Sequence, residues 1–296
     1  MTTAGGTSWA RKARRVKCLW TLLLAISVAA CAAPPQTHNA TGTTHSRIVA
    51  LVPFVADDLY AIGAGAQLVA VSAFTDDPRA RALPRVADVT GIDTERVVAL
   101  HPDLAIGIVS QKRLVDPLRR AGIDVVLLHD DAFADIFNNL RAIGALSGHA
   151  KQAAATVASL QRTTAQLRRM TSRFKRSPSV FVVLGSAPIW TAGSASYIAE
   201  LIALAGGTNA ARDLHVAYGQ YSAEALLRQQ PDLLVTDPAI HLDAVLGQEP
   251  WHSLQAVRAG RIYAVEPAAI IERPGPQYNE GIRWLVERIA PLALSS

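Results

Sequence analysis

The feature that most constrains the fold is a long segment, residues 148–176, that contains no proline and no glycine after its first residue. The segment is rich in Ala, Gln, Leu and Arg, which favour helix, so it predicts a single helix about 40 Å long. An approximate apolar stripe runs along it, formed by Ala154, Val157, Leu160, Leu167 and Met170. A helix of this length with one apolar face is expected to link two parts of the chain.

Strand and helix patterns alternate on both sides of this segment. Short apolar runs occur at 48–52, 68–71, 104–108, 123–128, 180–184, 233–235 and 261–265, and helices are expected near 196–205 and 278–290. Continuous apolar runs between helices are typical of buried parallel strands. The predicted fold class is therefore α/β: two Rossmann-like lobes, 47–147 and 177–296, joined by the linker helix 148–176, with a ligand cleft between the lobes.

The amino-terminal residues have the pattern of a secretion signal. A basic cluster at 11–17 is followed by an apolar run and by Val-Ala-Ala-Cys, which ends at Cys31. This pattern is similar to a bacterial lipoprotein signal, so residues 1–30 are predicted to be a cleaved signal peptide and Cys31 the lipidated first residue. Residues 31–46, with two adjacent prolines, are interpreted as a flexible tether. The protein is then expected outside the cytoplasm, held to a bacterial membrane by lipid.

The basic cluster also explains the overall charge. The formal charge is +5, and the cluster contains five Lys and Arg residues, so the remaining chain is close to neutral. No stripe of basic residues with interleaved aromatics remains, which argues against a nucleic-acid partner. Cys18 and Cys31 are the only cysteines, so the body of the protein is expected to fold without an internal disulfide.

Two segments, 93–104 and 222–233, repeat one pattern. Each places a glutamate, Glu95 or Glu224, seven positions before a Pro-Asp-Leu that opens an apolar run. The residues that begin the two segments, Asp93 and Ser222, are expected to be N-caps of short helices. The two glutamates then either complement helix dipoles, each with about 0.3–1 kcal/mol, or present matching carboxylates to a partner with twofold symmetry.

Several stretches together resemble a known family, the solute-binding proteins for cobalamin, ferric siderophores and haem, also called helical-backbone metal receptors. The stretches are 47–53, 61–63, 74–78, 94–104, the linker helix, 206–209 and 260–265. The resemblance extends from about Arg47 to the end of the chain and is strongest to the cobalamin-binding members. It implies a monomer with two rigid lobes that captures a metal chelate, cobalamin or a ferric siderophore, and delivers it to a homodimeric ABC permease with ATPase subunits. It also implies that Glu95 and Glu224 are the residues that dock on the permease.

The resemblance implies aromatic walls for the cleft. Phe74, Trp190 and Tyr218 stand at or near aromatic pocket positions of the family, whereas Val89 replaces a tryptophan. A cleft for a large, partly apolar chelate should offer aromatic faces and a few fixed polar groups. Tyr221 also fits that description and is predicted to be a ligand-binding residue.

Arg273 and two histidines are the polar candidates. Arg273 lies in a loop that resembles the family's ligand loop in the second lobe, where it could meet an anionic group of a chelate. His129 and His215 could face the cleft and would suit a haem or free-metal (Zn or Mn) receptor, which is an alternative function. No histidine pair has the spacing of a metal motif, so no metal site and no cofactor are predicted.

Neither of two short motifs supports an enzyme. Gly63-Ala-Gly65 lacks the third glycine of a dinucleotide turn, and Gly185-Ser186-Ala187 lacks the second glycine of a nucleophile elbow. The adjacent acids at 57–58, 76–77 and 130–131 are interpreted as solvated turns and caps. No catalytic residue is predicted. A cell-envelope lipoprotein without a small ligand stays open as a second alternative.

Overall fold

The computed structural model describes residues 44–88 and 90–295. The predicted signal peptide, Cys31 and Val89 lie outside these residues. Within the described ranges, no helix is both long and apolar enough to cross a membrane.

The first lobe is a parallel sheet covered by helices. Its strands are β1 (Ile48–Ala50), β2 (Leu68–Ser72), β3 (Arg85–Ala87), β4 (Leu104–Ile108) and β5 (Asp124–Leu128), in the order β3-β2-β1-β4-β5. Its helices are α1 (Pro53–Ala61), α2 (Thr94–Ala99), α3 (Asp116–Arg120) and α4 (Phe133–Leu146), with short 3₁₀ turns at Gly65–Gln67, Pro78–Ala80 and Val109–Gln111. All paired strands are parallel, and the central strand β1 is fully buried, as its continuous apolar sequence predicts.

The second lobe repeats a parallel sheet and adds an antiparallel ribbon. The parallel strands are β6 (Ser179–Val183), β9 (Thr208–Asn209), β11 (Leu233–Thr236) and β12 (Ile262–Ala264), in the order β12-β11-β6-β9. The ribbon, which the sequence patterns did not predict, has the order β10-β8-β7, with β7 at Gly185–Ser186, β8 at Ile189–Ala192 and β10 at Tyr218–Gln220. The helices are α6 (Tyr197–Leu204), α7 (Ala223–Gln229), α8 (Gln255–Arg258), α9 (Ala269–Glu272) and α10 (Tyr278–Leu294), with 3₁₀ turns at Pro238–Ile240, Leu242–Val245 and Trp251–Ser253. The predicted α/β fold class with two lobes is confirmed.

The linker helix α5 spans Ala150–Thr171, so it is shorter than the predicted 148–176. Its 22 residues extend about 33 Å. Gly148 has a φ of +76°, a left-handed conformation that ends α4 and prevents α5 from starting there. The predicted apolar stripe is partly wrong: Ala154 is exposed and the side chain of Met170 is 57% exposed. The buried face is instead Ala153, Val157, Leu167 and Thr171.

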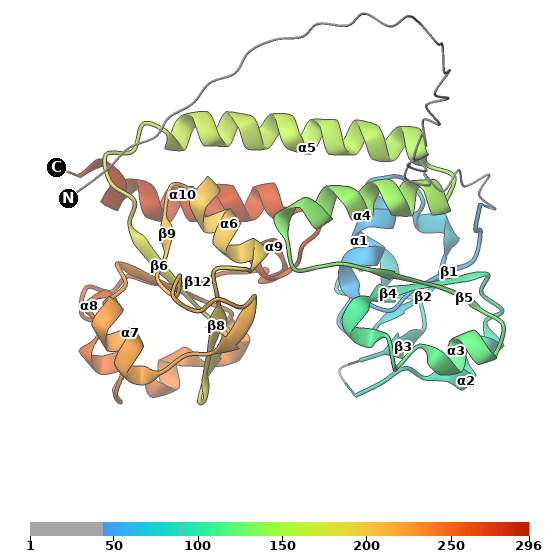
Figure 1. The fold of residues 1–296 in the computed structure, drawn as a ribbon, viewed down its shortest axis with the longest axis horizontal. Helices are drawn as coiled ribbons and strands as arrows, with labels where there is room; N and C mark the ends of the chain where they lie inside the picture. The colour runs from blue at the N-terminus through green and yellow to red at the C-terminus, as the bar shows by residue number, and fades with distance from the viewer. Residues whose placement is uncertain (1–43, 89, 296) are drawn as a thin grey trace, which may run out of the picture. The chain divides into compact units, whose positions relative to one another are not determined.

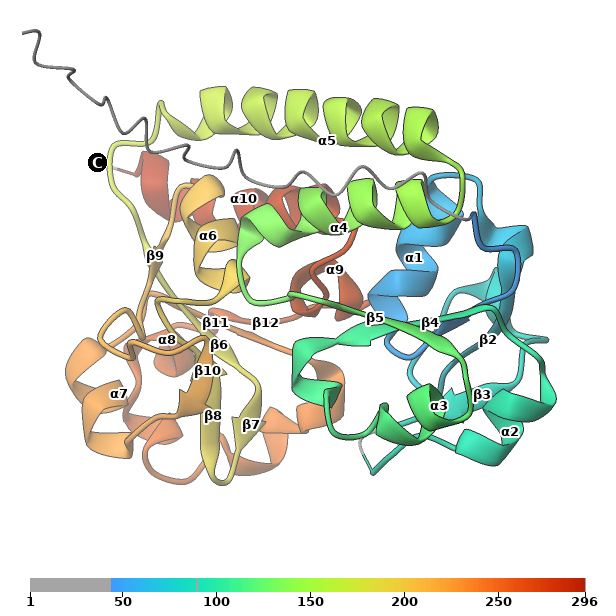
Figure 2. The ribbon, with the colours of Figure 1, turned by 45° about the vertical axis from the view of Figure 1, so that its right-hand side comes forward.

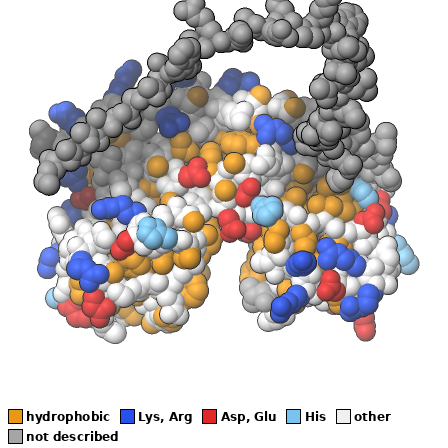
Figure 3. All heavy atoms as spheres, in the orientation of Figure 1, with side chains coloured by type: hydrophobic (Ala, Val, Ile, Leu, Met, Phe, Trp, Pro, Cys, Tyr) orange, Lys and Arg blue, Asp and Glu red, His pale blue; other side chains and the backbone are white. Residues whose placement is uncertain are grey.

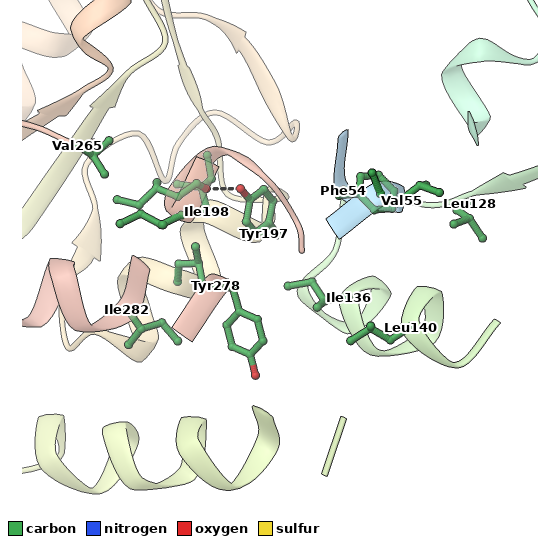
Figure 4. Packing of buried hydrophobic residues seen from close by; sticks show 14 of the residues in the cluster. Phe54, Val55, Leu128, Ile136, Leu140, Tyr197, Ile198, Val265, Tyr278 and Ile282 are labelled. Carbon is green, nitrogen blue, oxygen red and sulfur yellow. Dashed lines mark hydrogen bonds between the residues drawn. The ribbon is translucent and has the colours of Figure 1, made fainter. Parts of the chain in front are cut away.

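The lobes are joined by a packed layer of helices as well as by α5. Figures 1 and 2 show α5 lying across α4 of the first lobe and α10 of the second. Under α5, Phe133 and Phe137 of α4 meet Tyr278 of α10 in edge-to-face contacts, with ring centroids 5.0–5.9 Å apart. The Tyr278 hydroxyl lies 2.7 Å from Thr164 Oγ1 on α5, and Figure 4 shows Tyr278 between buried residues of the two lobes. The largest apolar core therefore runs through both lobes.

The Pro-Asp-Leu of the repeat anchors the first strand of each lobe. Asp103 Oδ2 accepts a hydrogen bond from the Ser46 amide (2.8 Å), and Asp232 Oδ2 accepts one from the Ser179 amide (2.7 Å). The predicted tether, 31–46, therefore extends too far, because Ser46 is bonded to the first lobe. The His45 amide likewise donates to the Leu146 carbonyl (2.8 Å).

Candidate ligand cleft and docking surface

A candidate first wall of the cleft lies at the carboxyl ends of β1, β2 and β4. A hollow of about 340 Å³ opens there, lined by residues at or just after the ends of these strands, among them Val52, Phe74 and Ile108. Ligands of open parallel sheets bind at this edge, because the loops there vary without disturbing the strands. The Phe74 side chain is 53% exposed, which is unusual for a large aromatic ring and marks it as available for contact.

The candidate second wall is the antiparallel ribbon of the second lobe. Trp190 of β8 pairs with Gln220 of β10, and Tyr218 stands two residues before Gln220. Side chains two apart on a strand share a face, so Trp190 and Tyr218 project from the same side of the ribbon. Their side chains are 40% and 37% exposed. Figure 3 shows hydrophobic side chains on the flanks of both lobes that face the hollow between them.

Tyr221 does not belong to this wall, so its predicted placement is wrong. Its ring is 8% exposed and packs against Phe181, with 5.5 Å between the centroids. Its hydroxyl donates to Asp213 Oδ1 (2.7 Å). Tyr221 directly follows Gln220, and the alternation of a strand directs it to the opposite face, into the core of the second lobe.

Arg273 lies where the two lobes meet, at the end of α9. Its Nη1 lies 2.6 Å from Asp76 Oδ1 and 3.5 Å from Asp57 Oδ2, both in the first lobe. Its Nη2 donates to the Phe74 carbonyl oxygen (3.0 Å). The predicted ligand for this side chain was an anionic group of a chelate. In the structure, carboxylates of the protein hold that position.

Two partly buried acids, Asp130 and Glu272, have raised pKa values; the sequence analysis interpreted Asp130 as part of a solvated turn or cap and did not single out Glu272. Burial raises the pKa of Asp130, after β5, to about 6, and the neighbouring Asp131 adds to the effect. Burial also raises the pKa of Glu272, at the end of α9, to about 7, with a further contribution from Asp237. Burial raises the pKa of Tyr218, and the charge of Asp130 raises it further, which places these groups near one another. Figure 3 shows acidic side chains gathered where the lobes meet.

The interpretation of the paired acids as solvated turns and caps holds for one of them and fails for another. Asp77 is a cap: its Oδ1 accepts a hydrogen bond from the Arg79 amide (2.8 Å) at the start of a 3₁₀ turn. Asp58 is fully buried on α1, and neither carboxylate oxygen has a hydrogen-bond partner among the residues that the structure describes. Burial and the adjacent Asp57 raise the pKa of Asp58 well above its usual value.

Glu95 and Glu224 occupy matching positions on the two lobes. Each lies in the first turn of its helix, α2 or α7, behind an N-cap whose side chain accepts a backbone amide, as predicted. Both glutamates are exposed. Within the described ranges, neither forms an ion pair or a side-chain hydrogen bond. Figure 1 shows α2 and α7 in different lobes, both away from α5.

The two candidate histidines belong to different lobes, and each has a polar contact within its own lobe. The His129 carbonyl accepts a hydrogen bond from Asn139 Nδ2 (2.7 Å), and His215 Nδ1 lies 3.4 Å from Ser194 Oγ. Among residues 44–88 and 90–295, no group of three or more His, Cys, Asp or Glu side chains is arranged to hold a metal ion.

Two α/β lobes joined by a packed helix layer, with exposed aromatic side chains on each lobe, have the architecture of proteins that capture a ligand between lobes. Residues 48–269 match the model of the family described as periplasmic binding protein, and the chain belongs to this family.

The chain is also similar to individual proteins of known sequence or structure. The chain is 28% identical to YvrC of Bacillus subtilis, an uncharacterized ABC transporter substrate-binding lipoprotein, over 83% of this chain and 80% of that one. It is 33% identical to the vitamin B12-binding protein of Pectobacterium atrosepticum, over 64% of this chain and 70% of that one. The solved structure of the periplasmic vitamin B12 binding protein BtuF of Vibrio cholerae superposes with a TM-score of 0.74 at 26% identity, covering 85% of this chain and 99% of that one.

Proposed function

We propose that the protein is the extracytoplasmic substrate-binding lipoprotein of an ABC importer and that it captures a metal chelate between its lobes. The observation that carries the proposal is the exposure of aromatic side chains on both lobes, Phe74 on one and Trp190 with Tyr218 on the other. The proposal places these rings across the cleft from each other. Burying exposed aromatic rings against a large flat ligand is favourable, and nearby polar groups can bind the polar edges of that ligand. The names of the similar proteins, a substrate-binding lipoprotein and vitamin B12-binding proteins, support this class.

The proposed ligand is a corrinoid such as cobalamin, with a ferric siderophore as the second choice. The vitamin B12-binding relative favours the corrinoid. The walls also suit it, since a corrin ring is broad and partly apolar and can lie against aromatic faces from two sides. Haem has a comparable size and stays the alternative within the same cleft.

Tryptophan fluorescence tests the ligand class. Trp190 is exposed in the proposed wall, whereas Trp251 is 2% exposed in the core and serves as an internal reference. Titration of the purified protein with cyanocobalamin, ferrioxamine and haemin should give saturable quenching with one of them, cyanocobalamin by this proposal. Trp190→Phe should remove most of the quenching. Tyr221→Phe is the matched control, because that ring lies in the core, and it should bind as the wild type does.

Other outcomes of the titration distinguish the alternatives. Saturable quenching by haemin alone would identify a haem receptor. Binding of Zn²⁺ or Mn²⁺ alone, measured by calorimetry, would identify a free-metal receptor. A response to none of these probes would remove the cleft assignment and favour a cell-envelope lipoprotein without a small ligand.

Glu95 and Glu224 are proposed to dock on a homodimeric permease. Two matching, exposed carboxylates on two lobes suit a partner that presents one basic residue on each of two identical subunits. Exposed ion pairs contribute about 0–1 kcal/mol each, so they would orient a transient encounter rather than hold a stable complex. This is the behaviour that a delivery protein needs.

Transport measurements separate docking from ligand capture. Glu95→Ala combined with Glu224→Ala should leave the affinity for cyanocobalamin unchanged and abolish its uptake by cells. The matched control is Asp116→Ala with Glu249→Ala, whose side chains are 53% and 62% exposed elsewhere on the two lobes. Unimpaired uptake in the glutamate variant would reduce Glu95 and Glu224 to helix-terminus acids.

The lipid anchor is a separate part of the proposal. Cys31 follows a signal-like segment, and the similar Bacillus subtilis protein is named a lipoprotein. Growth of expressing cells with labelled palmitate should label the wild-type protein, and Cys31→Ser should abolish the label. Labelling that persists in this variant would exclude Cys31 as the lipidated residue.

A further inference from the structure

Arg273 makes contacts that cross from one lobe to the other. It belongs to the second lobe, yet its partners Asp57, Asp76 and the carbonyl of Phe74 all belong to the first. The side chain of Arg273 is only 18% exposed, and that of Asp57 is 13% exposed. Gln277, at the start of α10, adds a weaker contact across the same boundary, with Nε2 3.5 Å from Asp57 Oδ2. The lobes are thus tied here by charge, on the cleft side of the helix layer.

The charge balance at this point disfavours an anionic ligand group. Two carboxylates face one guanidinium, and both terminal nitrogens of Arg273 already contact acceptors of the first lobe. Charge-assisted contacts of this kind are strong when they are shielded from water. An incoming anion would have to displace Asp76 and would still face the negative charge of Asp57.

Through its contact with the Phe74 carbonyl, Arg273 also holds the loop that carries Phe74. Phe74 lies in the loop between β2 and the 3₁₀ turn Pro78–Ala80, and this loop is held from two sides. From within the first lobe, Arg85 Nη1 donates to the Thr75 carbonyl (2.6 Å). From the second lobe, Arg273 holds the Phe74 carbonyl and Asp76. The backbone that carries the exposed Phe74 ring is therefore held by a residue of the opposite lobe.

We propose that Arg273 is a positioning residue, an interlobe latch that fixes the Phe74 loop against the second lobe and so sets the spacing of the two aromatic walls. It does not serve as the counter-ion of a bound ligand. The importance of the latch for ligand capture rests on the proposed function, whereas its effect on the loop does not.

Hydrogen exchange of the ligand-free protein tests the latch directly. The reporters are the amides of Ala73, bonded to the Ala87 carbonyl, and Thr75, bonded to the Ser72 carbonyl. Arg273→Ala and Asp76→Asn should each accelerate exchange of the Thr75 amide, by about tenfold for the arginine variant. The control is Arg79→Ala, which breaks the ion pair with Asp77 inside the first lobe. It should leave the Thr75 amide unchanged. Unchanged exchange in Arg273→Ala and Asp76→Asn would overturn the proposal whatever the ligand is.

Ligand titration then separates the latch from a counter-ion role. For a latch, Arg273→Ala and Asp76→Asn both weaken cyanocobalamin binding, by about tenfold for the arginine variant, and the double variant is no weaker than Arg273→Ala. A counter-ion role predicts the opposite sign for Asp76→Asn, because loss of that carboxylate frees the guanidinium and tightens binding. If accelerated exchange is found and cyanocobalamin binds to no form of the protein, the latch stands and the ligand assignment fails.

Discussion

The two lobes share a frame and differ at the surface that faces the cleft. In both, an aspartate of a Pro-Asp-Leu accepts a hydrogen bond from a serine amide at or just before the start of the first strand, and a glutamate lies in the first turn of a capped helix. The walls are built differently. The first lobe offers Phe74 on a loop at the carboxyl edge of its sheet, and the second offers Trp190 and Tyr218 on an additional antiparallel ribbon.

This difference shows which parts of the two lobes a partner with twofold symmetry would keep alike. Each lobe needs the same anchors for its first strand and its capped helix. A partner with twofold symmetry would also contact equivalent positions on both lobes, so these positions are alike. A metal chelate held between the lobes has no such twofold relation to them. The two walls are therefore free to differ, and each is built from the loops and ribbon that its own sheet allows.

The largest effect is expected from removing the Tyr278 ring, which packs in the helix layer that joins the two lobes. Tyr278→Ala should lower the free energy of unfolding by about 3–5 kcal/mol, because it deletes a buried ring between α4, α5 and α10. Denaturant unfolding followed by circular dichroism measures this loss. Tyr278→Phe keeps the ring and loses the hydroxyl contact to Thr164, and should cost about 1 kcal/mol. Equal losses in the two variants would contradict a packed junction between the lobes.

Because both lobes use the same aspartate anchor, removing it should destabilise the protein by a similar amount in either lobe. Asp103→Ala and Asp232→Ala should each lower the free energy of unfolding by about 1–3 kcal/mol, since each leaves a strand-leading amide without its charged acceptor. Burial alone would raise the pKa of each carboxyl. The combined hydrogen bonds from Ser46 and Arg47 to Asp103, and from Ser179 and Arg176 to Asp232, outweigh burial and lower the pKa. Thermal unfolding of both variants checks the prediction. A loss confined to one lobe would show that the repeated aspartates are not equivalent.

Because the ribbon carries two exposed aromatic rings and the loop carries one, their removal should weaken ligand binding to different extents. Trp190→Ala combined with Tyr218→Ala should weaken cyanocobalamin binding by about a hundredfold, and Phe74→Ala by about tenfold, since aromatic contacts contribute about 0.5–1.5 kcal/mol beyond the buried area. Isothermal titration calorimetry measures these affinities without relying on tryptophan emission. Equal effects of Phe74→Ala and the double variant would mean that the loop alone contributes as much as the ribbon.

The smallest effect concerns pH. Glu272 has a folded pKa of about 7, above its usual 4.5, so the folded state holds this proton more tightly than the unfolded state does. The stabilisation is fully present below pH 4.5 and is lost as the pH rises to about 7. Because Glu272 is partly exposed to water, which screens the effect, the loss is expected to be about 1–2 kcal/mol. Glu272→Gln should flatten the stability profile between these values in a denaturation series. A profile in this variant as steep as that of the wild type would assign the pH dependence to other groups, such as Asp130.

Much of the frame could be predicted from the sequence because it depends on local patterns. Apolar runs predicted the strands β1, β2, β4, β5, β6, β11 and β12, of which the edge strands β5 and β12 are only partly buried. The capping residues Asp93 and Ser222 predicted the starts of α2 and α7. The ribbon of the second lobe was missed, because its strands of two to four residues carry too few side chains to show an alternation. The outward direction of Trp190 and the inward direction of Tyr221 depend on that ribbon.

The sequence by itself determined that two α/β lobes with matching capped helices lie on either side of one long helix, because strand burial, helix propensity and capping are encoded by neighbouring residues. Only the tertiary structure decided which aromatic rings face the cleft and what Arg273 contacts. Asp57 and Asp76 lie about two hundred positions before Arg273 in the chain, and no local pattern relates residues so far apart. Their contact exists because α4, α5 and α10 pack the two lobes together.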